Sequence, residues 1–212
     1  KIILSAAIML ASVGAYAQHA VGSINLQPKI GVNIANVTET KDTDPRVGLA
    51  AGLEAEYQVS DIFSLSAGAI YSMQGTKRDW ENAGAKYTAT TKLDYINVPI
   101  LANVYVTKGL AVKLGVQPGF KVNAKYDTKA TALGLAVKTS SEPDVKSVDF
   151  SIPVGISYEY ANFQLDARYN WGLTKIYKHG DDKNSVFQIT LGYKFDLKIT
   201  FINKQREFNK QL

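Results

Sequence analysis

The feature that most restricts the fold is a repeated alternation of apolar and polar residues between Ile24 and Phe195. In the first stretch, for example, Ile30, Val32 and Ile34 alternate with small or polar residues. Successive side chains of a β-strand point to opposite faces, so a period of two indicates strands with one apolar and one polar face. The alternation occurs in eight stretches, at residues 24–34, 47–57, 63–74, 94–106, 110–123, 148–160, 163–171 and 187–195.

The connections between these stretches alternate in length. Short connections lie at residues 58–62, 107–109 and 161–162, and long polar ones at 37–46, 76–91, 128–144 and 175–184. Short turns at one end and long loops at the other are typical of barrels in bacterial outer membranes. We therefore predict an all-β domain, residues 18–197, that forms an eight-stranded antiparallel up-and-down transmembrane β-barrel.

The distribution of glycine indicates which face points into the barrel. Eight strands enclose a space that packed side chains fill, so the interior is the crowded side. Because the glycines fall on the polar face, we expect that face to point inward and the apolar face to meet lipid. These residues are Gly31, Gly48, Gly52, Gly68, Gly115, Gly119, Gly155, Gly172 and Gly192.

Aromatic residues on the apolar face support the same orientation. Two groups flank an aliphatic band, as in the aromatic girdles of transmembrane barrels. The short-turn group is Tyr57, Phe63, Tyr158, Tyr160, Phe163, Tyr193 and Phe195; the long-loop group is Tyr71, Phe120, Tyr126, Phe150, Trp171 and Phe187. Two soluble alternatives are a β-sandwich with aromatics at its strand ends and a lipocalin-like ligand carrier. The carrier would need an apolar interior and a Gly-x-Trp motif near the start, which this sequence lacks.

Both ends of the chain differ from the middle. Residues 1–17 hold a lysine, an apolar run and an A-x-A pattern ending at Ala17, so we expect a signal peptide that is cleaved there. Residues 198–212 form a basic C-terminal extension. These two segments carry most of the formal net charge of +5. The barrel itself has no basic stripe, and we expect no nucleic-acid partner.

Prolines lie inside several of the predicted strands. A proline lacks the N–H that a strand ladder needs, and a closed barrel has no free edge to tolerate the loss. We therefore expect bulges or ladder breaks at these positions. They are Pro28, Pro99, Pro118 and Pro153.

Three short motifs resemble the PorT-like outer-membrane β-barrel family, which is OmpA/OmpX-like in architecture. They are residues 29–33 (KIGVN), 93–99 (LDYINVP) and 191–195 (LGYKF), and the likeness covers residues 24–197. The resemblance implies a location in the cell outer membrane, surrounded by lipid. It also implies recognition of the last strand by the barrel-assembly machinery, and it fixes no activity. We expect the protein to be a monomer.

Residues suited to catalysis or metal binding are few. The sequence has no cysteine and only two histidines. His19 lies beside the predicted cleavage site, and His179 shares a long loop with Asp181 and Asp182. We interpret that loop as a solvated tip, with a loop-borne base or metal ligand as the alternative. We therefore expect no catalytic, cofactor-binding or metal-binding residues and no cofactor.

Charges on the polar face of the strands are more informative. Because buried charges persist only when they are paired, a balanced set predicts a salt-bridged network that closes the lumen. The alternative interpretation is a narrow path for ions or solutes. The four cations are Lys29, Lys113, Arg168 and Lys194, and the four carboxylates are Glu54, Glu56, Glu159 and Asp166.

Together these observations predict a non-enzymatic outer-membrane protein that presents four extracellular loops. Its role would lie in binding, adhesion or envelope integrity, with a loop partner that the sequence does not identify. A small-solute or ion channel is the first alternative. A soluble lipocalin-like carrier is the second.

Overall fold

The computed structural model describes residues 19–197, except residues 41, 83, 133–134 and 179. No helix in that part of the chain is long and apolar enough to cross a membrane. The predicted signal peptide and basic extension lie outside the described residues. The strands are β1 Ile24–Val37, β2 Asp44–Ser60, β3 Phe63–Asn82, β4 Ala85–Asn97, β5 Ile100–Thr107, β6 Leu110–Ala132, β7 Leu135–Ser141, β8 Val148–Tyr160, β9 Phe163–Gly172, β10 Asn184–Tyr193 and β11 Phe195–Leu197.

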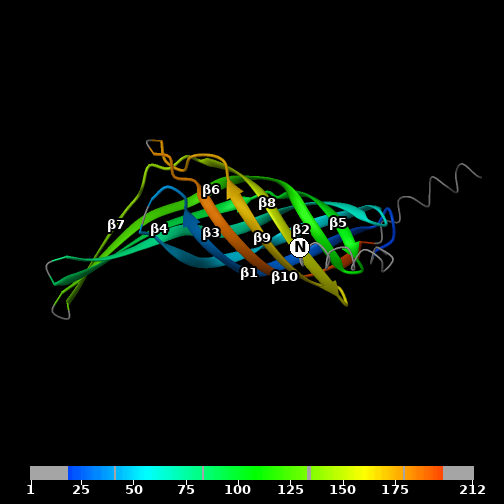
Figure 1. Cartoon of the computed structure of the whole chain (residues 1–212), viewed down its shortest axis with the longest axis horizontal. Coiled ribbons are helices and arrows are strands. Elements are labelled where there is room, and N and C mark those ends of the chain that lie inside the picture. The colour runs from blue at the N-terminus through cyan, green and yellow to red at the C-terminus, as the bar shows by residue number, and fades with distance from the viewer. Residues whose placement is uncertain (1–18, 41, 83, 133–134, 179, 198–212) are drawn as a thin grey trace, which may run out of the picture.

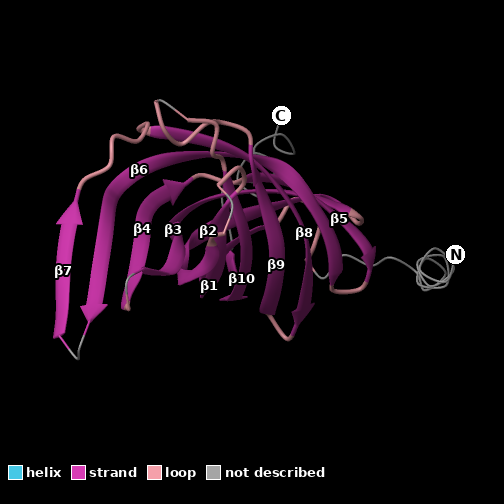
Figure 2. Ribbon diagram, turned by 60° about the vertical axis from the view of Figure 1, so that its left-hand side comes forward, coloured by secondary structure: helices cyan, strands magenta, loops and turns pink. Residues whose placement is uncertain are grey.

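These strands form one antiparallel ring (Figures 1 and 2). β1 closes the ring against β10, with Lys29 opposite Gly192. β4 and β5 make one ring strand that is interrupted at residues 98–99, and β10 and β11 make another that is interrupted at Lys194. β7 pairs with β6 outside the ring. The ring therefore has eight strands, which confirms the predicted barrel.

The two faces of the ring are chemically opposite. Large apolar side chains are exposed on the outside, for example Ile30, 61% exposed, and Leu114, 55% exposed. Inside, polar side chains such as Asn25, Gln27 and Gln164 are buried. An apolar outer surface of this extent is stable against lipid and unfavourable in water. The polar interior contradicts a lipocalin-like carrier, which would need an apolar one.

The interior is as crowded as the glycine pattern predicts. A Cβ atom on Gly31 would lie 1.9 Å from the carbonyl oxygen of Ile189, and one on Gly52 would lie 2.1 Å from that of Ala69. Non-bonded carbon atoms and carbonyl oxygens do not approach this closely. Only glycine therefore allows the neighbouring backbones to pass at these points.

The prolines coincide with interruptions of the ladder, as expected. Pro99 lies in the gap between β4 and β5, where the N–H of Val98 donates to the carbonyl oxygen of Pro118 at 2.8 Å. At Pro118, β6 changes its partner from β5 to β4. Pro153 faces a stretch in which the β6–β8 ladder is broken. Pro28 faces the gap between β10 and β11. Each proline therefore lies at, or opposite, a place where one ladder is interrupted.

Two of the segments predicted as long polar loops are β-structure instead. Residues 76–91 are mostly the ends of β3 and β4, and residues 128–144 include the end of β6 and all of β7. These two hairpins extend the sheet beyond the barrel (Figure 1), and β7 lies at its edge (Figure 2). Cross-strand packing supports the first hairpin, since Trp80 stacks on Tyr87 with ring centroids 5.3 Å apart.

A bulge in β6 corrects the orientation predicted for Tyr126. Between the pairs Asp94↔Asn123 and Tyr95↔Lys121 the register shifts, which leaves one additional residue on β6. The alternation of β6 is inverted beyond this point. Tyr126 therefore belongs to the inner face of the extended sheet, and not to the outer aromatic girdle.

Candidate functional site

The eight charged residues predicted for the lumen are all buried inside the ring, in two groups. We call the first the central charge cluster; its side chains, from β1, β2, β6 and β9, are no more than 2% exposed. We call the second the floor cluster, because it lies nearer the short turns. The central charge cluster is Lys29, Glu54, Lys113, Asp166 and Arg168; the floor cluster is Glu56, Glu159 and Lys194.

In the central charge cluster three cations surround two carboxylates. Arg168 holds Asp166 with two hydrogen bonds, Nε to Oδ1 at 2.7 Å and Nη2 to Oδ2 at 2.8 Å. It also reaches Glu54 Oε2 at 3.2 Å. Lys29 Nζ lies 2.9 Å from Glu54 and 3.3 Å from Asp166, and Lys113 Nζ lies 2.8 Å from Asp166. Each carboxylate therefore contacts all three cations, with Lys113 also 3.5 Å from Glu54.

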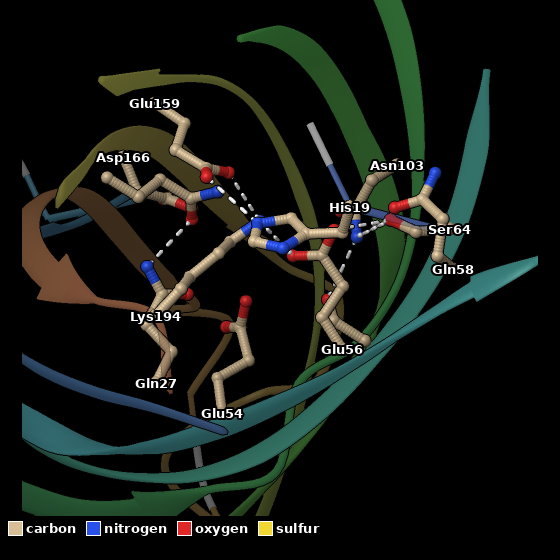
Figure 3. A network of polar contacts seen from close by, with 12 residues as sticks. His19, Gln27, Glu54, Glu56, Gln58, Ser64, Asn103, Glu159, Asp166 and Lys194 are labelled. Atoms are coloured by element: carbon tan, nitrogen blue, oxygen red, sulfur yellow. Dashed lines mark hydrogen bonds and ion pairs between the residues drawn. The ribbon is translucent and has the colours of Figure 1, made fainter. Parts of the chain in front are cut away.

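In the floor cluster one cation lies between two carboxylates. Lys194 Nζ is 2.9 Å from Glu56 and 2.8 Å from Glu159. The Tyr105 hydroxyl donates a hydrogen bond to Glu56. His19, which precedes β1, contacts Glu159 through Nε2 at 2.9 Å (Figure 3). The floor cluster thus connects the start of the described chain to β2, β8 and the break before β11.

The eight predicted charges do not include every member of this network, and Tyr105 and His19 are two of those left out. Tyr105 lies on the polar phase of its strand, between Val104 and Val106, so the alternation itself could have found it. His19 lies before the first alternating stretch and was noted only as a neighbour of the cleavage site. Nothing in its local sequence indicates a place inside the barrel, because its partner Glu159 is 140 residues away.

His19 is held between two carboxylates. Its Nε2 contacts Glu159 and its Nδ1 lies 2.9 Å from Asp196. The hydrogen bond to Glu159 raises the pKa of His19 above its ordinary value of 6.5, while burial and nearby Lys194 oppose this. A protonated His19 can donate to both carboxylates at once.

Because the pKa of His19 is raised by folding, its contribution to stability should depend on pH. The contribution is fully present below the ordinary pKa and is lost as the pH rises through the raised value. We therefore expect His19→Gln to lower the free energy of unfolding more at about pH 5 than at about pH 8.5. Urea unfolding of both proteins at the two pH values measures this. An equal loss at both values would contradict it.

The end of the lumen near the long loops is covered by an apolar cap. Leu93 and Tyr95 of β4 pack there with Val145 and Ile176 from the connections, and Tyr177 lies against them. Two contacts fix the connections to each other: the Val145–Tyr177 bridge and the hydrogen bond from Lys146 N to Ile176 O at 2.8 Å. The cap, the central charge cluster and the floor cluster therefore follow one another along the lumen.

Acidic residues of the fourth long loop form an ion pair and hydrogen bonds that hold the loop in place. Asp181 pairs with Lys175, and Asp182 accepts hydrogen bonds from the backbone N–H and the hydroxyl of Thr40. His179 lies outside the described residues. Within residues 19–197, apart from the gaps named above, no three potential ligands among His, Cys, Asp and Glu gather as a metal site would require.

Comparison with known protein families agrees with this architecture. The family model described as outer membrane protein beta-barrel domain matches residues 16–178. The chain belongs to this family. It is therefore an outer-membrane protein with a lipid-facing barrel. No curated protein matches the outer-membrane barrel significantly.

Solved structures of similar shape are bacterial outer-membrane barrels of low sequence identity. Ail, the attachment invasion locus protein of Yersinia pestis, is 14% identical with a TM-score of 0.47, over 83% of this chain and 100% of Ail. Neisserial surface protein A is 13% identical with a TM-score of 0.41, over 81% and 97% of the two chains. The N-terminal barrel of Pseudomonas aeruginosa OprF is 12% identical with a TM-score of 0.34, over 84% and 100%.

Proposed function

We propose that the protein is a closed, non-enzymatic outer-membrane barrel whose function lies on its surface at the loop end, in binding, adhesion or envelope integrity. The observation that carries this proposal is the central charge cluster. Its five side chains are fully buried across the lumen and paired with one another at 2.7–3.5 Å. A passing ion would have to break these pairs, at a cost of several kcal/mol each.

A second candidate function is a path for small solutes or ions. It is favoured by buried amides such as those of Asn25 and Asn170, which have no hydrogen-bond partner among the described residues. Such groups are places where water could bind. Current recordings of the purified protein in planar bilayers separate the two candidates, because a closed barrel carries no current.

We also propose that the chain belongs to the PorT-like branch of outer-membrane barrels. This rests on the motifs at residues 29–33, 93–99 and 191–195, which lie in β1, in β4 with the break that follows it, and in β10 with the start of β11. On this view the protein is a monomer, and the barrel-assembly machinery recognises its last strands during biogenesis.

A further inference from the structure

A groove runs along the inner face of the protruding sheet at the loop end. Its base is a pocket of about 190 Å³ between the first and last long connections and the sheet. Arg78 and Tyr126 line this pocket and also the next one outward, to which Trp80 contributes. The two pockets therefore adjoin the same two side chains. The residues that line these pockets include Thr40, Thr43, Thr76, Arg78, Trp80 and Tyr126.

Aromatic rings form one wall of the groove. Trp80 and Tyr126 are each 38% exposed, and both line the outer pocket. Trp80 is held in place by its stack on Tyr87, with the two ring planes 9° apart. The face of an aromatic ring carries negative charge density and attracts polarised C–H groups and cations. A fixed, flat and solvent-accessible ring of this kind fits the C–H face of a sugar.

The hydroxyl groups at the base offer acceptors to a ligand. Thr40 donates its proton to Asp182 at 2.8 Å. Thr43 and Thr76 donate to the side-chain oxygen of Asn36, at 3.0 and 2.7 Å. A hydroxyl has one proton and two lone pairs, so these groups can still accept but have no proton left. A ligand that satisfies them must bring several hydrogen-bond donors, O–H or N–H.

One cation completes the groove. Arg78 lines both pockets, and no carboxylate in the described part of the chain lies within 4.0 Å of it. Its neighbour Lys77, opposite Thr90, points to the other side of the sheet. The one carboxylate in the pocket, Asp182, is already held by Thr40. Arg78 is therefore available for an anionic group, and its guanidinium suits a carboxylate, sulfate or phosphate.

We propose that this groove binds a saccharide that carries an anionic group. The inference rests on the proposed function, since it names the ligand of the loop-end surface. A polyhydroxylated ring supplies the donors that the threonines need and the C–H face that Trp80 fits, and its anionic group meets Arg78. An extended peptide offers about one N–H per residue and would leave most of these acceptors unmatched.

Calorimetric titration of the folded full-length mature protein in detergent tests the proposal, with intrinsic tryptophan fluorescence as a second readout. The probes are a hyaluronan tetrasaccharide, its carboxyl-reduced neutral form and the phosphorylated oligosaccharide of deacylated lipopolysaccharide. We expect saturable binding of an anionic probe and at least about tenfold weaker binding of the neutral form. Tighter binding of the lipopolysaccharide oligosaccharide identifies the cell's own envelope as the source, and tighter binding of hyaluronan identifies an external glycan. Either result supports the proposal.

A pair of variants tests the residues. We expect Arg78→Gln to weaken binding about tenfold or more. Lys129→Gln should leave it unchanged, because Lys129, opposite Thr88, faces the other side of the same sheet. Heat-modifiable migration on gels checks that both variants fold. Equal losses in both variants, or equal binding of the neutral probe, would overturn the proposal.

Two further outcomes would also overturn the saccharide assignment. One is tighter binding of an oligoglutamate peptide than of any saccharide, which would assign the groove to a protein ligand. The other is no saturable binding by any probe. Neither result depends on conductance, so a closed barrel without saccharide binding would refute this inference and leave the proposed function intact.

Discussion

Replacing Asp166 with Asn is expected to lower the free energy of unfolding of the barrel by about 3–5 kcal/mol. Asp166 contacts Lys29, Lys113 and Arg168, and its side chain is fully buried. Its loss leaves three buried cations around the single carboxylate of Glu54. An uncompensated charge in an enclosed site destabilises the folded protein by far more than its former ion pair stabilised it. Reversible urea unfolding in lipid or detergent micelles measures the change.

Replacing a cation of the same cluster should lower the free energy of unfolding less. Arg168→Met removes the two hydrogen bonds to Asp166 but leaves Lys29 and Lys113 against two carboxylates. We therefore expect a smaller loss than for Asp166→Asn, and a double variant that recovers part of the loss. Thr190→Val is a matched control. Thr190 lies opposite Asp166, and its buried hydroxyl has no partner among the described residues, so this change should cost little. A larger loss of unfolding free energy for Arg168→Met than for Asp166→Asn would contradict the proposed excess of cations in the central charge cluster.

Replacing Leu191 with Arg should cost about 2–4 kcal/mol of the free energy of unfolding. Leu191 is 49% exposed on the outside of β10, in the aliphatic band between Phe187 and Tyr193. If this surface meets the hydrocarbon core, the substitution transfers a guanidinium from water into lipid. Urea unfolding in lipid vesicles measures the cost.

Leu135→Arg is the matched control for this prediction. Leu135 is 76% exposed on β7, which lies outside the ring on the protruding sheet. Both leucines are accessible, and only their surroundings differ. We expect a near-neutral effect at Leu135, because its side chain faces water. Similar effects at the two positions would contradict the assigned membrane boundary.

The barrel could be predicted from the sequence because the apolar–polar alternation that specifies it is local and is repeated in every strand. The period of two assigns each side chain to a face, and the glycines select which face is inside; this was sufficient to predict the eight-stranded ring and the interruptions at Pro28, Pro99, Pro118 and Pro153. A charged side chain on the inner face of a narrow ring can point only into the enclosed lumen. The positions of the lumen charges could therefore be inferred before their partners were known.

The alternation pattern gave wrong predictions where pairing between strands decides the structure. Polar composition at residues 76–91 and 128–144 resembled loops, but pairing across the hairpins and the Trp80–Tyr87 stack support strands there. One bulge was enough to reverse the orientation of Tyr126. The division of the charges into a central cluster of net positive charge and a floor cluster of net negative charge depends on side-chain reach. Alternation carries no information about that.

If paired charges close the lumen, the folded protein carries no current, and electrical recording detects this. Purified, folded protein, verified by heat-modifiable migration, would be added to planar bilayers in concentrated KCl beside a large porin as positive control. The central charge cluster predicts insertion without conductance steps, because its buried side chains are already paired at 2.7–3.5 Å. Reproducible single-channel currents from the unmodified protein would show that the lumen conducts and would make the channel the first candidate.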